Sequence, residues 1–205
     1  MTSRFLNLVF SPAVKAAQEQ NGSRQAYARR DDASDPDRLG DNEAAFIATR
    51  DSFYMASVGV DGWPYVQHRG GMPGFVKLLG DRAIGFADFR GNRQYVSIGN
   101  FVDNDRVALF FMDYPRRARL KLLGRARIVD LTDDSKLAAM LIDPAYKAKV
   151  ERGIVIDVEA FDWNCSQHIT ERFTLTEIAP TIERFNRRIA ELEAEVASLK
   201  AAAPA

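Results

Sequence analysis

The pattern of apolar and polar positions changes character twice along this chain of 205 residues. Residues 11–50 are mostly polar and predict a helical approach, in which Ser11 is a suitable N-cap and Pro12 a suitable first helical residue. A second short helix is expected to begin at Asp41. We therefore assign residues 1–42 to an N-terminal segment of helices and loops.

From Phe53 onward the pattern becomes a series of short apolar runs separated by turn residues, as is typical of β-strands. Asp61-Gly62 predicts a two-residue hairpin turn. Gly124, inside a later run, predicts a bulge or a close approach of two backbones. Many short strands joined by short turns predict a mainly β fold, a closed or nearly closed barrel with flanking helices over residues 43–178. The expected strands cover residues 54–60, 64–67, 74–79, 83–87, 106–112, 119–129 and 153–161, with short helices at 95–101 and 134–142.

The last stretch, residues 179–205, predicts a long amphipathic helix. Its apolar residues recur at alternating spacings of three and four, which defines a heptad seam. Two interpretations remain open. The seam packs against the barrel of its own chain, as an ordinary amphipathic stripe does, or it pairs across a dimer, because a two-position seam is narrower than usual. The seam residues are Ile182, Phe185, Ile189, Leu192, Val196 and Leu199.

Composition narrows the class of partner. The 28 Lys and Arg residues balance 28 Asp and Glu residues, so no global basic field indicates nucleic acid. The single cysteine, Cys165, excludes an intrachain disulfide framework, and no cysteine or histidine spacing indicates a metal site. No apolar run is long enough to cross a bilayer, and the N-terminus lacks the features of a signal peptide. We expect a cytoplasmic protein without a membrane partner.

Arginines, amides and glycines gather at strand ends within the barrel region. Arg69 stands beside Gly70-Gly71, where the backbone is expected to approach a ligand closely. Arg90 and Arg93 bracket Gly91-Asn92, just before a helix expected to begin near Arg93. A helix N-terminus and an adjacent guanidinium group together bind phosphate well. The pattern therefore suits a flat, phosphorylated cofactor. The alternative, which stays open, is that Arg90 and Arg93 are ordinary solvated turn residues.

Two further groups of residues have ligand-binding side chains. Gln67 and His68 are neighbours on a strand, so they are expected to face opposite sides of the sheet. A purely structural His68 is the alternative. Trp163, His168 and Arg172 lie in a polar segment that either contributes to a ligand site or is a surface loop with one aromatic anchor. The sequence gives no support to a cysteine–histidine nucleophile pair or to a hydrolase motif.

These residues give the chain a resemblance to a known family. Over about residues 43–175 it resembles the pyridoxamine 5'-phosphate oxidase-related family of FMN-binding split barrels. The resemblance implies a homodimer with two FMN molecules in clefts between the subunits. The segments that carry it are 64–71, 74–76, 86–93, 120–126 and 164–169.

The resemblance also assigns expected roles around the cofactor. Gln67 stands where the family has a flavin-binding arginine, and Arg69 follows on the same face. Asp88 matches a flavin-contacting threonine. Arg119 matches a glutamine that the other subunit contributes. Gln94 replaces the lysine of the family's phosphate-binding turn, so phosphate binding is expected to depend on the remaining residues of that turn, which are Arg93, Asn92 and Arg90.

The substrate-binding end of the family pattern is missing. The oxidase closes its site with a tryptophan and an Arg-x-His-x-Arg motif, of which only Trp163, His168 and Arg172 remain, at other spacings. Pyridoxamine phosphate is therefore not the expected substrate. The expected function is an FMN-dependent oxidoreductase acting on another small molecule. The alternatives are a non-catalytic FMN-binding or sensing protein, and the same fold binding F420 or haem.

Overall fold

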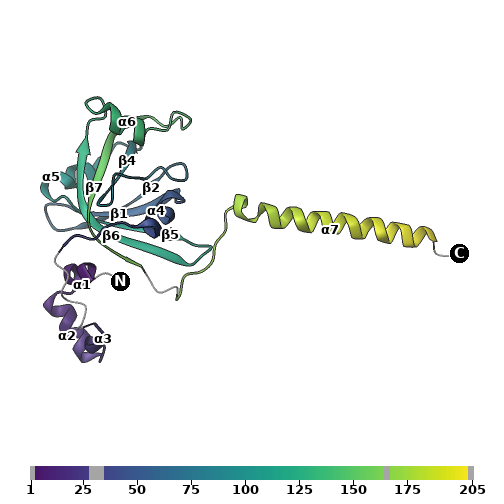
Figure 1. Cartoon of the computed structure of the whole chain (residues 1–205), viewed down its shortest axis with the longest axis horizontal. Coiled ribbons are helices and arrows are strands. Elements are labelled where there is room, and N and C mark those ends of the chain that lie inside the picture. Colours follow the sequence, from purple (N-terminus) through teal and green to yellow (C-terminus); the bar gives the residue numbers. More distant parts are fainter. Residues whose placement is uncertain (1–2, 28–34, 164–166, 203–205) are drawn as a thin grey trace.

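The computed structural model describes residues 3–27, 35–163 and 167–202 of the chain. A group of small helices, a strongly curved β-sheet and a long projecting helix follow one another along the sequence (Figure 1). The mainly β fold with flanking helices is therefore confirmed. The helices are α1 (Ser3–Val9), α2 (Pro12–Gln20), α3 (Arg24–Tyr27), α4 (Asp41–Ala48), α5 (Val96–Asp103), α6 (Ser135–Leu141) and α7 (Leu175–Ala202).

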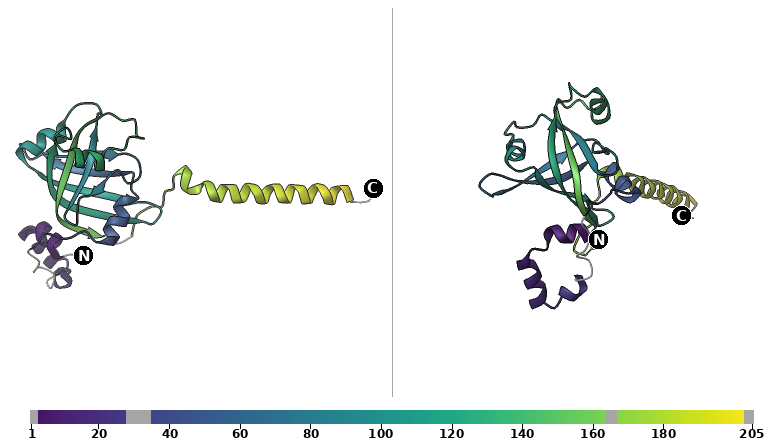
Figure 2. Two further views of the ribbon diagram at one scale, coloured as in Figure 1. Left: turned by 45° about the horizontal axis from the view of Figure 1, so that its top comes forward. Right: turned by 60° about the vertical axis from the view of Figure 1, so that its left-hand side comes forward.

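One antiparallel sheet of seven strands forms the body, in the order β2-β1-β5-β6-β7-β4-β3. The sheet curls around a core of aromatic and branched side chains (Figure 2), in which Phe53 contacts the rings of Phe86 and Phe111 at 5.2 and 4.9 Å between centroids. The strands are β1 (Ser52–Val58), β2 (Pro64–Gly70), β3 (Lys77–Leu78), β4 (Ala83–Phe89), β5 (Arg106–Asp113), β6 (Ala118–Val129) and β7 (Val150–Trp163).

Two predicted details of the strands are wrong. The apolar run 74–79 is a strand only at Lys77–Leu78, because Phe75 and Val76 instead fill the barrel interior as buried coil residues. The first hairpin has five residues between the paired Val58 and Pro64 rather than two. Its turn is closed by the Gly62 N–H donating to the carbonyl of Gly59 (2.9 Å).

The predicted irregularity at Gly124 is confirmed. Leu123 pairs with Ala160, whereas Gly124 pairs with Val158, so Glu159 is the extra residue of a β-bulge. The bulge turns the Glu159 side chain toward Arg4 and Arg125. At Gly124, strands β6 and β7 approach so closely that a Cβ would lie 2.6 Å from the backbone oxygen of Asp157.

Helix α1 was not predicted from the sequence. It packs Phe5 and Leu6 against Ala160 on the outer face of β7, and Lys121 lies over the Phe5 ring at 4.9 Å. The segment has only seven residues, and its two buried residues are neighbours in the sequence, so no helical period of apolar residues could be recognised. An ion pair also holds the helix against the sheet, because Arg4 binds Glu159 at 3.1 Å.

Replacing Glu159 with glutamine is expected to weaken the fold near neutral pH but much less in acid. Hydrogen bonds from Arg4 and Arg125 lower the pKa of the Glu159 carboxyl group below its usual 4.5. The folded carboxylate therefore contributes its full stabilisation above that value and loses it as the pH falls through the folded pKa. The ion pairs are partly exposed, so we expect a loss of about 0.5–1 kcal/mol.

Urea unfolding near neutral pH and at a pH well below 4.5 measures this effect, because the contribution is lost only below the folded pKa. The gap between wild type and Glu159→Gln should narrow in acid. Asp157→Asn is the matched control on the same strand, because its ion pair with Arg127 is longer, at 3.5 Å, and more than half exposed. A gap for Glu159→Gln that is the same at both pH values would contradict the assignment.

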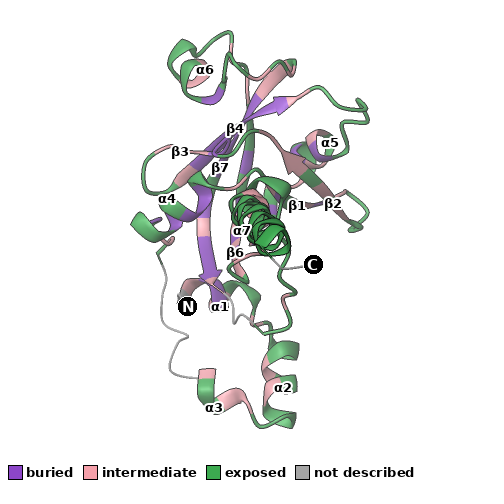
Figure 3. Ribbon diagram, turned by 90° about the vertical axis from the view of Figure 1, so that its right-hand side faces the viewer, coloured by how far each residue is buried: buried purple, intermediate pink, exposed green. Residues whose placement is uncertain are grey.

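The long C-terminal helix is confirmed, and it begins at Leu175. Thr174 and Glu177 form a capping box, in which the Thr174 N–H donates to Glu177 Oε2 (2.8 Å) and the Glu177 N–H donates to Thr174 Oγ1 (3.2 Å). Seen end-on, α7 is exposed around its circumference (Figure 3) except near its start, where Ile178 and Ala179 are partly buried. The interpretation that its seam packs on its own barrel is therefore wrong. No helix among the described residues has the length and apolar character needed to cross a lipid bilayer.

Candidate cofactor site

The sheet's two ends meet at a split in the barrel. Strand β2 is one edge of the sheet and β4 lies beside the other edge, yet Arg69 of β2 and Asp88 of β4 form an ion pair of 2.5 Å. A cavity of about 220 Å³ opens at this contact, between β2, the end of β4 and the start of α5. The curvature of the sheet therefore brings together residues from three separate stretches of sequence.

Strand β2 lines one wall of the cavity with alternate residues, Tyr65, Gln67 and Arg69. Gln67 pairs in register with the buried Met55, which fixes its side chain on the inner face. The Ser97 hydroxyl on α5 donates to Gln67 Oε1 (3.0 Å). This bond orients the amide so that its Nε2 donors are available to a ligand in the cavity.

A buried charge cluster forms the floor. The Asp88 carboxylate, 5% exposed, lies between Arg69 and Arg152, whose Nε is 3.4 Å from Asp88 Oδ2. Burial raises the pKa of the Asp88 carboxyl group, although both guanidinium groups act in the opposite direction. Arg69 Nε is buried without a hydrogen-bond partner among the described residues, so the floor retains capacity to bind an anion.

The turn between β4 and α5 forms the opposite wall. Arg93 and Tyr95 both have left-handed backbone angles, with φ of 63° and 55°. Such residues are uncommon outside glycine and often mark functional sites. They delay the helix until Val96, which is one residue after the start of the expected range 95–101 and three residues after Arg93. No side chain caps α5, and its first three residues line the cavity, so the start of the helix is placed where an anion could bind.

The side chains of this turn are held to different degrees. Arg90 donates through Nε to Glu151 Oε1 (2.8 Å), and Tyr95 Oη donates to the same oxygen (3.3 Å). Both hydrogen bonds lower the pKa of the Glu151 carboxyl group, and the bond from Arg90 has the larger effect. Arg93 is exposed, and its hydrogen bond among the described residues is to Tyr95 Oη (3.4 Å). Asn92 Oδ1 accepts from the Gln94 N–H (3.2 Å).

Two guanidinium groups, of Arg69 and Arg93, and two carboxylates, of Asp88 and Glu151, line the cavity. Arg90 and Arg152 bind these carboxylates from outside the lining, so the whole cluster has a formal charge of two positive. Of the four arginines, Arg93 is the one whose guanidinium is not bound to a carboxylate within the part of the chain that the structure describes. In the same part of the chain, no group of three or more His, Cys, Asp or Glu side chains is placed to hold a metal ion.

Six of the predicted site residues line this cavity and a seventh, Arg90, binds its rim residue Glu151. The six are Gln67, Arg69, Asp88, Asn92, Arg93 and Gln94. Gly70 and Gly71, predicted to let the backbone approach a ligand, do not line this cavity. A Cβ at Gly71 would lie 2.7 Å from the Phe75 ring, so the absence of a side chain there allows Phe75 to pack.

Two predicted residues lie on the outer face of the sheet. His68 is exposed and packs against Tyr54 with ring centroids 5.6 Å apart. Arg119 of β6 lies over the Phe110 ring at 5.6 Å. Both are on the face of the sheet away from the cavity of the same chain.

Three predicted residues near the chain's C-terminal part lie elsewhere. Trp163 donates through Nε1 to Glu43 Oε1 (2.7 Å) and contacts the Phe46 ring, so it anchors α4 to the barrel. Arg172 lies over the Tyr114 ring at 5.1 Å. His168 is exposed and lines no part of the cavity. Cys165 lies outside the described residues.

The prediction also missed several cavity residues. Glu151 and Arg152 arrive on β7, about sixty positions after the turn that they contact, and nothing local marks them. The sequence gave weak indications of Tyr65 and Ser97. Tyr65 lies two positions before Gln67 on the same strand, and Ser97 lies in the first turn of the helix that follows the predicted phosphate-binding turn. Tyr95 could not be recognised, because its left-handed conformation has no sequence signature.

The curved antiparallel sheet, with a cavity at the split between its ends, defines a split β-barrel. The chain belongs to the pyridoxamine 5'-phosphate oxidase family, whose profile matches residues 39–178. The recognition made from the sequence is therefore confirmed. A search of curated proteins found no match.

Solved structures with similar folds have low sequence identity. HupZ from Group A Streptococcus is 16% identical and covers 66% of this chain and 100% of its own, with a TM-score of 0.46. An F420 reductase is 19% identical and covers 60% and 98%, with a TM-score of 0.43. An FMN-binding protein from Syntrophomonas wolfei is 13% identical and covers 60% and 83%, also with a TM-score of 0.43.

Proposed function

We propose that this chain is a flavoprotein that binds FMN in the cavity at the barrel split and acts as an oxidoreductase on a small molecule. The observation that carries the proposal is Arg93, an exposed guanidinium that binds no carboxylate of the described residues and lies beside the uncapped start of α5. Membership of the pyridoxamine 5'-phosphate oxidase family supports the same ligand.

The residues present suit the two ends of the cofactor. Arg93, Asn92 and the first N–H groups of α5 would hold the phosphate, with Arg90 at the rim. Gln67 would offer amide donors to the polar edge of the ring system, and Arg69 would add positive charge. Bound FMN supplies hydride and electron transfer, which the protein's own side chains cannot provide.

The cavity favours FMN over haem. Its lining among the described residues contains no His, Cys or Met, and tyrosine, a less common haem ligand, is present as Tyr65 and Tyr95. F420 shares the phosphorylated, flat chemistry of FMN, so the experiment must compare the two directly.

We further propose that two copies of the chain form the working unit. The cavity of about 220 Å³ is smaller than the roughly 300–1,000 Å³ typical of ligand pockets, and it is open on one side. The outer face of β1 and β2 exposes Tyr54, Val66 and His68, which suits burial against a second copy. In such a dimer, Arg119 would reach the cavity of the other copy rather than its own.

Titration of the purified protein with FMN, followed by flavin fluorescence, tests cofactor binding. We expect saturable binding of FMN, weaker binding of riboflavin, which lacks the phosphate, and no haem spectrum. If the protein does not bind FMN but binds F420 or haem tightly, the proposal of FMN is wrong and the other cofactor is the ligand of this site. A monomeric mass for the FMN-loaded protein would contradict the proposed dimer.

The catalytic part is tested separately. A nicotinamide donor should reduce the bound flavin, and an added acceptor should reoxidise it through repeated turnovers. Tight FMN binding without reduction by any donor would instead support a non-catalytic binding or sensing protein.

A further inference from the structure

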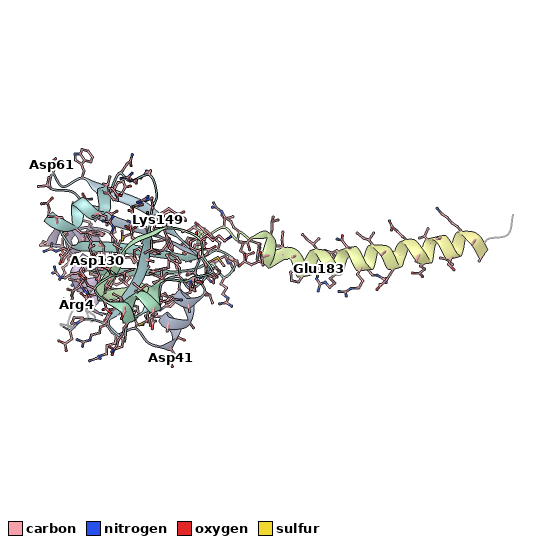
Figure 4. The ribbon with its side chains drawn as sticks, turned by 90° about the horizontal axis from the view of Figure 1, so that it is seen from above. Arg4, Asp41, Asp61, Asp130, Lys149 and Glu183 are labelled. Carbon is pink, nitrogen blue, oxygen red and sulfur yellow. The ribbon has the colours of Figure 1, made fainter. Side chains whose placement is uncertain are left out.

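The long helix α7 leaves the barrel and carries an apolar seam that is largely exposed to solvent. Figures 1 and 4 show it projecting from the body, with Glu183 and its other side chains spread into solvent. All of α7 is described, and none of its residues is buried. The six seam side chains are each 42–64% exposed; they are Ile182, Phe185, Ile189, Leu192, Val196 and Leu199.

Such a helix needs a partner for its stability. Most helix stability in proteins comes from packing of an apolar face rather than from intrinsic propensity. The seam follows the spacing of a coiled coil, with Ile182, Ile189 and Val196 at position a and the other three residues at position d. Pro180 falls at position f, on the side away from the seam, so its missing N–H and its ring do not disturb pairing.

We propose that α7 pairs with α7 of a second copy of this chain as a parallel, two-stranded coiled coil. The core composition favours this form, because β-branched residues at a (Ile189, Val196) and leucine at d (Leu192, Leu199) select two parallel strands. The inference goes beyond cofactor binding and does not depend on it.

The charges beside the seam select the same orientation. In a parallel pair, each g residue lies beside the e residue five positions later on the other helix. Arg188 then meets Glu193 of the second copy, and Glu195 meets Lys200. In an antiparallel pair with the same seam, Arg188 meets Glu195, but Glu193 faces the neutral Asn186. The parallel form therefore has twice as many complementary pairs.

The existing contact of Arg188 does not oppose this arrangement. It donates to Glu191 within the same helix at 3.0 Å, and both side chains are more than half exposed. An exposed pair at this spacing contributes little. Arg188 can therefore exchange Glu191 for Glu193 of the second copy with little loss of free energy.

Cysteine cross-linking in the full chain tests the proposal. In a Cys165→Ser background, Leu199→Cys should form an intermolecular disulfide on mild oxidation, because equivalent d positions adjoin only in a parallel pair. In the antiparallel pair, the two copies of residue 199 lie roughly 25 Å apart at 1.5 Å per residue. Ala194→Cys, on the f position opposite the seam, is the matched control and should remain largely uncross-linked.

Charge exchange supplies the second measurement. Glu193→Arg in the Leu199→Cys chain should lower the rate of cross-linking several-fold, and adding Arg188→Glu should restore it. Three results would overturn the proposal: equal cross-linking at residues 194 and 199, cross-linking only between Ile182→Cys and Leu199→Cys chains, or failure of the double charge exchange to restore the rate. All measurements use protein without added FMN, so a failure here leaves the proposed cofactor site untouched.

Discussion

Gly124→Ala is expected to lower the free energy of unfolding by about 2–3 kcal/mol. A Cβ at this position would lie 2.6 Å from the backbone oxygen of Asp157 and 2.6 Å from Ile156 Cγ2. The oxygen belongs to the neighbouring strand at the bulge, so it cannot rotate away as a flexible side chain would. Relief requires a shift of β6 relative to β7, and overpacking of this kind costs about 1–3 kcal/mol or more.

Gly99→Ala provides the matched control for this substitution. Gly99 lies within α5, and no atom lies within 4 Å of the position that a Cβ would take there. Alanine should therefore stabilise the helix by about 0.5–1 kcal/mol. Urea unfolding of both variants should give changes of opposite sign. Equal, small effects would mean that the two strands adjust freely at the bulge and that the crossing is not tight.

The sequence predicted the strands well because their burial alternates. β5 and β6 carry buried residues at every second position over most of their length, which is the two-residue period that the pattern detects. The run 74–79 failed for a definable reason. Phe75 and Val76 are buried, but in a coil that plugs the barrel, and a short apolar run does not distinguish a strand from such a plug.

The candidate site was predictable only in its local part. Arg93, Asn92 and Gln67 were identified because turn residues, an expected helix start and strand alternation are all features of neighbouring positions. Glu151 and Arg152 were missed because only the pairing of β4 with β7 brings them to the turn. The same limit explains Trp163, whose hydrogen bond to Glu43 joins residues 120 positions apart.

Arg93→Ala is expected to weaken FMN binding by about 10- to 100-fold. A hydrogen bond to a charged group contributes about 1.5–3 kcal/mol, and each 1.4 kcal/mol changes the affinity about tenfold. The fold should be nearly unaffected, because Arg93 is exposed and donates only to Tyr95 Oη among the described residues. Alanine also carries the same Cβ as arginine, so the left-handed backbone at this position is no more strained than before.

A comparison of FMN with riboflavin assigns the lost affinity to the phosphate. If Arg93 holds the phosphate, Arg93→Ala should weaken FMN strongly and riboflavin by less than about twofold, so that the two ligands approach the same affinity. Arg187→Ala, on the f position of α7, removes the same charge far from the cavity and should leave both affinities unchanged. An equal loss for both ligands would place Arg93 against the ring system instead. An unchanged FMN affinity would remove Arg93 from the site, and the phosphate would then have to be held by the start of α5 and the arginines of the cavity floor.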